Sequence, residues 1–167
     1  MKELLDKLSS YNIFNYLFPG ILFVVFAEQF TSYIFIKEDI FEGLITYYFV
    51  GLVISRFGSV VIECILKKSK FVKFAKYSDF VKACKKDEKI SLLSEQNNMY
   101  RTLISMFIFL LLLKGYELLS VKLTFLNQWG LLILIIFLIV IFMYAYKKQT
   151  KFIKDRVKIQ EGKNEHD

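Results

Sequence analysis

The run at residues 130–146, GLLILIIFLIVIFMYAY, constrains the fold of this chain more than any other stretch. It carries no charged side chain, whereas a helix of a water-soluble protein keeps one polar face. At about 1.5 Å per residue, such a run reaches most of the way across a hydrocarbon layer of about 30 Å. Trp129, Tyr144 and Tyr146 at its ends match the aromatic belts of membrane interfaces. Residues 129–146 are therefore predicted to span a membrane.

Three further apolar runs, at residues 18–36, 44–66 and 99–119, have a suitable length for spans. Pro19 lies at the start of the first run, where proline suits the first turn of a helix. The whole chain is 55% hydrophobic, which is above the usual range for soluble domains. A soluble helical bundle with a rich core is the alternative, but four such runs favour an all-α integral membrane protein with four transmembrane helices.

The polar parts complete the predicted organisation. Residues 1–17 place Leu4, Leu5 and Leu8 at helical spacing among charged side chains, which predicts an amphipathic interfacial helix. Spans one and two occupy residues 18–66, a basic and helical cytoplasmic connection occupies 67–98, and spans three and four occupy 99–146. A charged cytoplasmic tail, 147–167, ends the chain.

The distribution of lysine and arginine predicts the orientation. Ten basic residues lie between Lys67 and Arg101, and seven lie in the tail. The connection after the first span has only Lys37 against three acids, and that after the third has Lys122. Cytoplasmic loops of membrane proteins carry the excess of basic residues. Both termini and the central segment are therefore expected in the cytoplasm.

Charged residues interrupt the first two spans. An ionisable group at the bilayer centre costs at least about 2.5–3.5 kcal/mol, so it usually pairs or marks a functional site. Glu28 and Arg56 each lie ten residues from the cytoplasmic end of their span, at a depth of about 15 Å. This equal depth predicts an ion pair, within one subunit or between subunits. Ser59 and Glu63 are expected on the Arg56 face, and all four residues are pore or gate candidates.

Small residues line the second span. Gly51, Ser55 and Ser59 recur every four residues, and Gly58 adds another small site. Such residues let membrane helices approach closely, and hydroxyl groups can bond across the interface. Gly51, Ser55 and Gly58 are thus predicted to pack helices together. For Arg56, Glu28 and Glu63 the same structural role stands beside a role in conduction or gating.

The basic segment mixes aromatic and cationic side chains. Residues 71, 74, 77 and 80 are aromatic and fall close to one helical stripe. An amphipathic helix on anionic lipid is one interpretation. The other is a site for a phosphate-bearing signal, in which lysines meet phosphates and aromatic rings stack on bases. The signal-binding candidates are Lys70, Lys73, Lys76, Tyr77, Lys82 and Arg101. The helix of the third span is expected to begin before residue 99, which places Arg101 near Glu63.

Nothing in the sequence predicts an enzyme, a metal site or a cofactor. The sole histidine, His166, is next to last in the chain, and Cys64 and Cys84 lack a metal-ligand spacing. A phosphate-binding glycine loop and a nucleophile with a neighbouring base are also missing from the sequence.

Three motifs carry a resemblance to a known family. YNIFNYLFPG near the start, GLVISRFGSVVIE in the second span and LSEQNNMYRTL before the third resemble small four-span effectors of bacterial anti-phage defence. The Hailong effectors are the more similar, and the Kiwa membrane protein is more distant. The resemblance implies a homo-oligomeric, tetrameric ion channel. It also implies a partner nucleotidyltransferase whose single-stranded DNA product, or another nucleotide signal, holds the channel closed. Loss of that signal during infection would open the channel and depolarise the cell.

Two other functions remain open from the sequence. A membrane scaffold would recruit a cytoplasmic partner through the basic segment, with Glu28 and Arg56 purely structural. A small transporter subunit is the third interpretation, although the glycine and proline signals of broken helices are largely absent from the spans.

Overall fold

A computed structural model describes residues 12–164 and is helical, with no strand among them. A single π-helical turn, η1 (Ile13–Leu17), leads directly into α3 (Phe18–Phe30). The second long helix is formed by α4 (Ile40–Phe57), a π-helical turn η2 (Gly58–Ile62) and α5 (Glu63–Lys68). A short helix α6 (Tyr77–Cys84) precedes α7 (Lys89–Lys122) and α8 (Thr124–Asn164).

Four of these helices are long and apolar enough to cross a membrane, as predicted. They are Ile13–Phe30, Ile40–Lys68, Lys89–Lys122 and Thr124–Glu161. Their bounds differ from the predicted ones, since α7 and α8 continue far into the polar segments. The expected helix that leads into the third span is confirmed, because α7 begins at Lys89. Residues 1–11, which hold most of the predicted amphipathic helix, lie outside the described residues.

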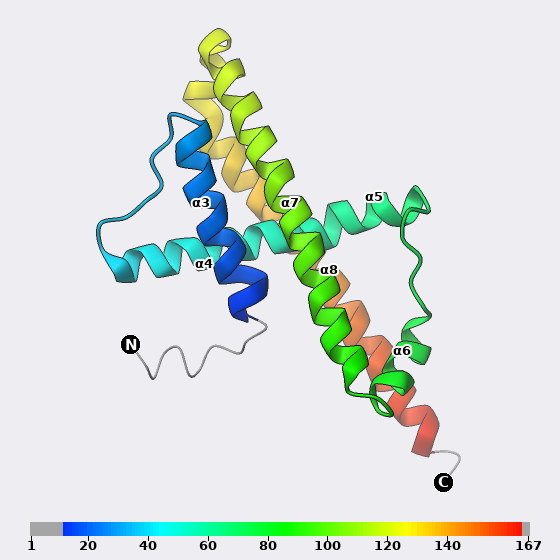
Figure 1. Cartoon of the computed structure of the whole chain (residues 1–167). Helices are drawn as coiled ribbons and strands as arrows, with labels where there is room; N and C mark the ends of the chain where they lie inside the picture. The colour runs from blue at the N-terminus through cyan, green and yellow to red at the C-terminus, as the bar shows by residue number, and fades with distance from the viewer. Residues whose placement is uncertain (1–11, 165–167) are drawn as a thin grey trace.

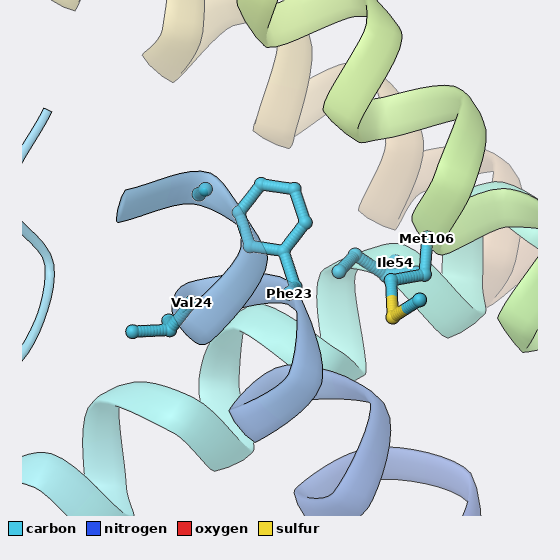
Figure 2. Close-up of a cluster of buried hydrophobic side chains, with 5 residues drawn as sticks. Phe23, Val24, Ile54 and Met106 are labelled. Atoms are coloured by element: carbon cyan, nitrogen blue, oxygen red, sulfur yellow. The ribbon is translucent and has the colours of Figure 1, made fainter. Parts of the chain in front are cut away.

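The helices do not form a simple parallel bundle. The α7 and α8 helices run antiparallel beside each other, and α4 crosses α3 and α7 instead of running alongside them (Figure 1). The core lies at this crossing, where Phe23, Val24 and Ala27 of α3 meet Ile54 of α4 and Met106 of α7 (Figure 2). Elsewhere α7 and α8 leave most of their apolar side chains uncovered.

The first long helix, Ile13–Phe30, begins five residues earlier and ends six residues earlier than the predicted span at residues 18–36. It ends at Phe30 instead of residue 36, because Thr31 adopts an extended conformation and its hydroxyl bonds to the Ala27 carbonyl oxygen at 2.7 Å. Residues 31–39 then connect to α4 without a helix. Asp39 caps the N-terminus of α4 by accepting the backbone N–H of Glu42 at 2.9 Å. The apolar composition of residues 31–36 concealed this break.

The basic segment also departs from the prediction. Its aromatic residues at 71, 74, 77 and 80 do not form one helical stripe, because residues 71–76 are not helical and α6 begins only at Tyr77. Ser69 ends α5, and Lys70 has a φ of 60° in the left-handed region, which breaks the helix. Residues 71–76 are then irregular. Phe71 and Phe74 are consequently exposed, while Val81 of α6 is buried. The Tyr77 ring packs against the Phe152 ring of α8, with 5.2 Å between the ring centres.

Candidate functional site

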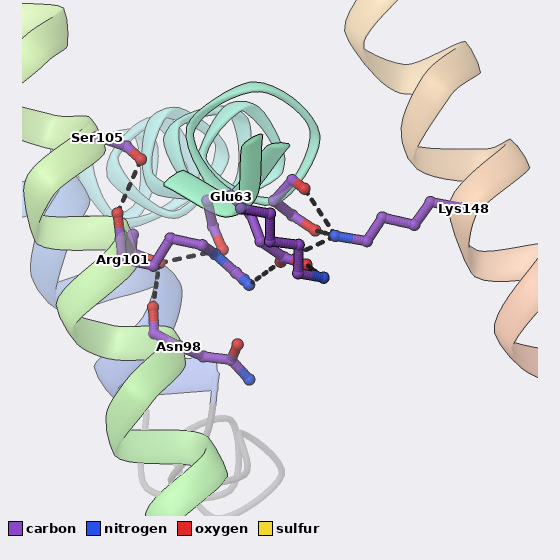
Figure 3. Close-up of polar contacts among 9 residues, drawn as sticks. Glu63, Asn98, Arg101, Ser105 and Lys148 are labelled. Carbon is purple, nitrogen blue, oxygen red and sulfur yellow. Dashed lines mark hydrogen bonds and ion pairs between the residues drawn. The ribbon is translucent and has the colours of Figure 1, made fainter. Parts of the chain in front are cut away.

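A cluster of charged side chains joins three of the long helices around Glu63. Its carboxylate accepts from Arg101 Nη1 of α7 at 2.7 Å, from Lys148 Nζ of α8 at 2.9 Å and from Lys67 Nζ of α5 at 2.6 Å. Lys148 Nζ also donates to the carbonyl oxygen and the hydroxyl oxygen of Ser59, at 2.7 and 2.8 Å (Figure 3). We call these five residues the Glu63 cluster. The expected proximity of Arg101 to Glu63 is confirmed.

The Glu63 cluster is partly shielded from solvent and is not neutral. Glu63 is 7% exposed, and the side chains of Arg101, Lys148 and Lys67 are 16%, 26% and 45% exposed. Three cations face one carboxylate, which leaves a formal excess of positive charge. Arg101 Nε is buried and has no hydrogen-bond partner among the described residues. A shielded charge needs a partner, so the local charge balance favours an additional anion.

The π-helical turn η2 decides which way Glu63 faces. It lies between Arg56 and Glu63, in the second span. A π-turn bonds residue i to i+5, so it shifts the following residues around the helix axis relative to a regular α-helix. Counting in regular turns therefore gave Arg56 and Glu63 one common face, whereas the two side chains have different partners in the structure. Turns of this kind occur frequently at functional sites.

The predicted Glu28–Arg56 ion pair is not formed within the described chain. Arg56 Nη2 donates to the hydroxyl oxygen of Tyr16, and its guanidinium lies 5.6 Å from the centre of the Tyr16 ring. Glu28 Oε1 accepts the backbone N–H groups of Phe35, at 2.7 Å, and of Ile36. The early end of α3 explains this difference within one copy of the chain, because it brings the N–H groups of the connecting segment within reach of Glu28. A pair between two copies stays a prediction.

The small residues of the second span lie at its tightest contacts. A Cβ on Gly51 would lie 1.8 Å from the carbonyl oxygen of Tyr16, so the backbones of α4 and η1 touch here. Ser55 is buried and its hydroxyl accepts from Thr102 of α7 at 3.3 Å. A Cβ on Gly58 would lie 2.4 Å from Ser105 Oγ, which also belongs to α7. These three positions let one helix pack closely against two neighbours.

The signal-binding candidates do not share one place. Lys70, Lys73, Lys76 and Lys82 are exposed on the segment around α6. Tyr77 packs against Phe152, which limits its use as a stacking platform. Arg101 belongs to the Glu63 cluster instead. The sequence missed Lys148 altogether, because nothing in the tail distinguishes it from Lys147.

A second polar contact lies at the other end of the helices. Glu117 Oε2 pairs with Lys114 Nζ at 2.6 Å, the local pair that their spacing of three suggests. Glu117 Oε1 accepts the backbone N–H of Ser32 at 2.7 Å. Together with Glu28, this carboxylate fixes the segment that follows α3 against the rest of the structure.

These observations define a class of protein: an all-helical chain with four helices long and apolar enough to span a membrane, and with a charged cluster between three of them. Comparison with protein-family models, with curated proteins and with solved structures finds no match to this chain. Among the described residues, no group of three or more histidine, cysteine, aspartate or glutamate side chains could hold a metal ion.

Proposed function

We propose that the protein is a multi-pass protein of the bacterial inner membrane that assembles into a homo-oligomeric ion channel, with both termini in the cytoplasm. The four apolar helices and the excess of basic residues in the central segment and the tail support the membrane placement. The exposed apolar faces of α7 and α8 supply surface for lipid and for further copies of the chain. A tetramer follows from the resemblance to the Hailong effectors.

The Glu63 cluster is the observation that carries the channel proposal. Ionisable groups shielded between apolar helices are costly, and in membrane proteins they usually line ion pathways or control them. Glu63, Arg101 and Lys148 come from three different helices, so their bonds hold those helices in one arrangement. In this proposal that arrangement is the closed state, and loss of the bonds opens a path between helices or between copies. Glu28 and Arg56 hold the neighbouring segments in place.

The proposed signal is an oligonucleotide or nucleotide bound on the cytoplasmic side. The exposed Lys70, Lys73, Lys76 and Lys82 offer positive charge for its phosphates. As in the family that the sequence resembles, the signal would come from a nucleotidyltransferase and keep the channel closed. Its loss on infection would depolarise the cell, which makes the protein an effector of anti-phage defence.

A gating test compares two substitutions of the same kind. Glu63→Gln removes the charge that holds Arg101 and Lys148, whereas Glu42→Gln changes an exposed acid in the first turn of α4. We expect cells that express Glu63→Gln to depolarise in a voltage-sensitive dye assay, and cells with Glu42→Gln to behave like wild type. In planar bilayers, purified Glu63→Gln protein should conduct ions, whereas purified Glu42→Gln protein should stay closed like the wild type. If correctly inserted Glu63→Gln protein carried no current, the channel proposal would be refuted.

A membrane scaffold is the second candidate, and the exposed basic segment favours it. Phe71 and Phe74 are exposed beside lysines, a combination that suits a binding surface for a partner protein. Pull-down of one folded cytoplasmic partner, lost in Lys70→Glu with Lys73→Glu, together with flat bilayer currents would support this alternative.

A further inference from the structure

We propose that the Glu63 cluster binds the phosphate group of an anionic phospholipid headgroup. The proposal rests on the membrane insertion proposed above, but it does not require the protein to conduct ions. It assigns a lipid site to Arg101 and Lys67, with Lys148 as the supporting cation.

The charge of the cluster is the first argument. The single carboxylate of Glu63 forms ion pairs with three cations, Lys67, Arg101 and Lys148. One carboxylate offsets a single positive charge, so two of the three positive charges stay formally uncompensated, and the side chains of Arg101 and Lys148 are only 16% and 26% exposed. Such charge is expensive unless an anion completes it. A phosphate group fits this need, because it carries negative charge on several oxygen atoms that accept hydrogen bonds.

The free donors of the cluster are the second argument. Lys148 Nζ already makes three hydrogen bonds, which use all the protons of an ammonium group. Arg101 donates to Glu63 through Nη1, and no hydrogen bond from its Nη2 is formed among the described residues. Its Nε also lacks a partner there, but this atom is buried and out of reach of a headgroup. Lys67 Nζ donates to Glu63 and lies 4.2 Å from the centre of the Phe74 ring, which leaves further protons. Arg101 and Lys67 are therefore the donors available to a phosphate group.

The position of the cluster favours a lipid as the source of the phosphate. Lys67 and Lys68 end the second long helix, where the predicted cytoplasmic surface of the membrane begins. On α8, the residues about one turn before Lys148, Met143 and Tyr144, are exposed. An acyl chain can lie on this apolar surface while its headgroup reaches the cluster. A soluble phosphate would gain nothing from these exposed side chains.

The test measures phosphatidylglycerol binding to the full-length protein by native mass spectrometry, in micelles that also contain phosphatidylcholine. We expect wild-type protein to retain phosphatidylglycerol preferentially. Arg101→Gln removes charge-assisted hydrogen bonds and should weaken retention about tenfold. Lys67→Gln, at a more exposed position, should weaken retention as well, and it covers the case in which Arg101→Gln fails to fold. Lys147→Gln, next to Lys148 and exposed, is the matched control and should leave retention within about twofold of wild type.

Equal retention of both lipids by wild-type protein would overturn the proposal, and so would retention by Arg101→Gln and Lys67→Gln that matches the Lys147→Gln control. Displacement of phosphatidylglycerol by millimolar inorganic phosphate would overturn the lipid source. A protein that inserts, conducts and shows no lipid preference would refute this inference alone.

Discussion

Lys148 of α8 and Ser59 of η2 lie 89 residues apart in sequence, yet Lys148 Nζ bonds to both the carbonyl and the hydroxyl oxygen of Ser59. The carbonyl is in a π-helical turn, where the usual helical bond pattern is interrupted. The same ammonium group reaches Glu63 at 2.9 Å. Lys148 thereby fixes the mostly exposed α8 to the second long helix at one defined point.

This contact predicts a stability effect for Lys148→Met. The substitution keeps a long apolar side chain but removes three hydrogen bonds, and Glu63 retains Arg101 and Lys67 as partners. Because hydrogen bonds to charged groups contribute about 1.5–3 kcal/mol each before such compensation, we expect a net loss of about 1–3 kcal/mol. In detergent, the thermal midpoint of helix loss should fall by roughly 3–10 °C. Lys147→Met should leave the midpoint unchanged, and an equal drop in both variants would contradict the contact.

The backbone contact at Gly51 leads to a second prediction. A Cβ at this position would lie 1.8 Å from the carbonyl oxygen of Tyr16, which cannot move aside as a side chain can. Gly51→Ala should therefore separate η1 from α4 and cost about 1–3 kcal/mol or more, the usual cost of overpacking. Loss of helical circular dichroism on heating in detergent measures the change.

Gly115→Ala is the matched control for Gly51→Ala, because nothing lies within 4 Å of the added Cβ. Alanine favours a helix over glycine by up to about 1 kcal/mol, so this variant should be as stable as wild type or slightly more stable. If both variants lost stability to the same degree, the close approach at Gly51 would not be the cause.

The sequence predicted the four long apolar helices because long runs with few or no charged residues are stable only in lipid or in a protein core. It could not predict where they end. After α3 ends at Phe30, the following segment is held by Glu28, whose carboxylate accepts N–H groups seven and eight residues later. Such a contact between a helix and the following irregular segment leaves no periodic trace in the sequence.

The candidate site was predicted only in part, and the cause of the gaps is similar. Burial of charge in a span pointed to Glu63 and Arg56, and the early start of α7 placed Arg101 near Glu63. Within one copy of the chain Arg56 bonds to Tyr16 and not to Glu28, because equal depth in two antiparallel helices says nothing about the direction in which each side chain points. A Glu28–Arg56 pair between two copies stays a prediction. Lys148 was missed because the rotation of α8 about its axis, and not the residue type, sets it apart from Lys147.

Glu28 gives a third prediction, on the segment after α3. Glu28→Ala removes the acceptor of the Phe35 and Ile36 N–H groups. Bonds to a charged acceptor contribute about 1.5–3 kcal/mol, so exchange of these two amides should speed up by about 10- to 100-fold. Hydrogen–deuterium exchange with mass spectrometry resolves this segment. The neighbouring Gln29 is exposed, and Gln29→Ala should leave both amides as slow as in wild type.

The proposed orientation gives a fourth prediction, which uses the two native cysteines. Cys84 lies in α6, within the basic segment, and Cys64 lies in α5. In a Cys64→Ala variant, a membrane-impermeant maleimide should label Cys84 in inverted membrane vesicles and leave it unlabelled in intact spheroplasts, because lysine-rich loops stay in the cytoplasm. The opposite pattern would reverse the orientation.

A cysteine on the other side completes the orientation test. Lys122 ends α7 and is exposed, at the connection to α8. With both native cysteines replaced by alanine, Lys122→Cys should react with the maleimide in intact spheroplasts. Labelling of Cys84 and of Lys122→Cys from the same side would mean that α7 does not cross the membrane. The excess of lysine would then reflect a surface-bound protein, and the channel proposal would fail with the topology on which it depends.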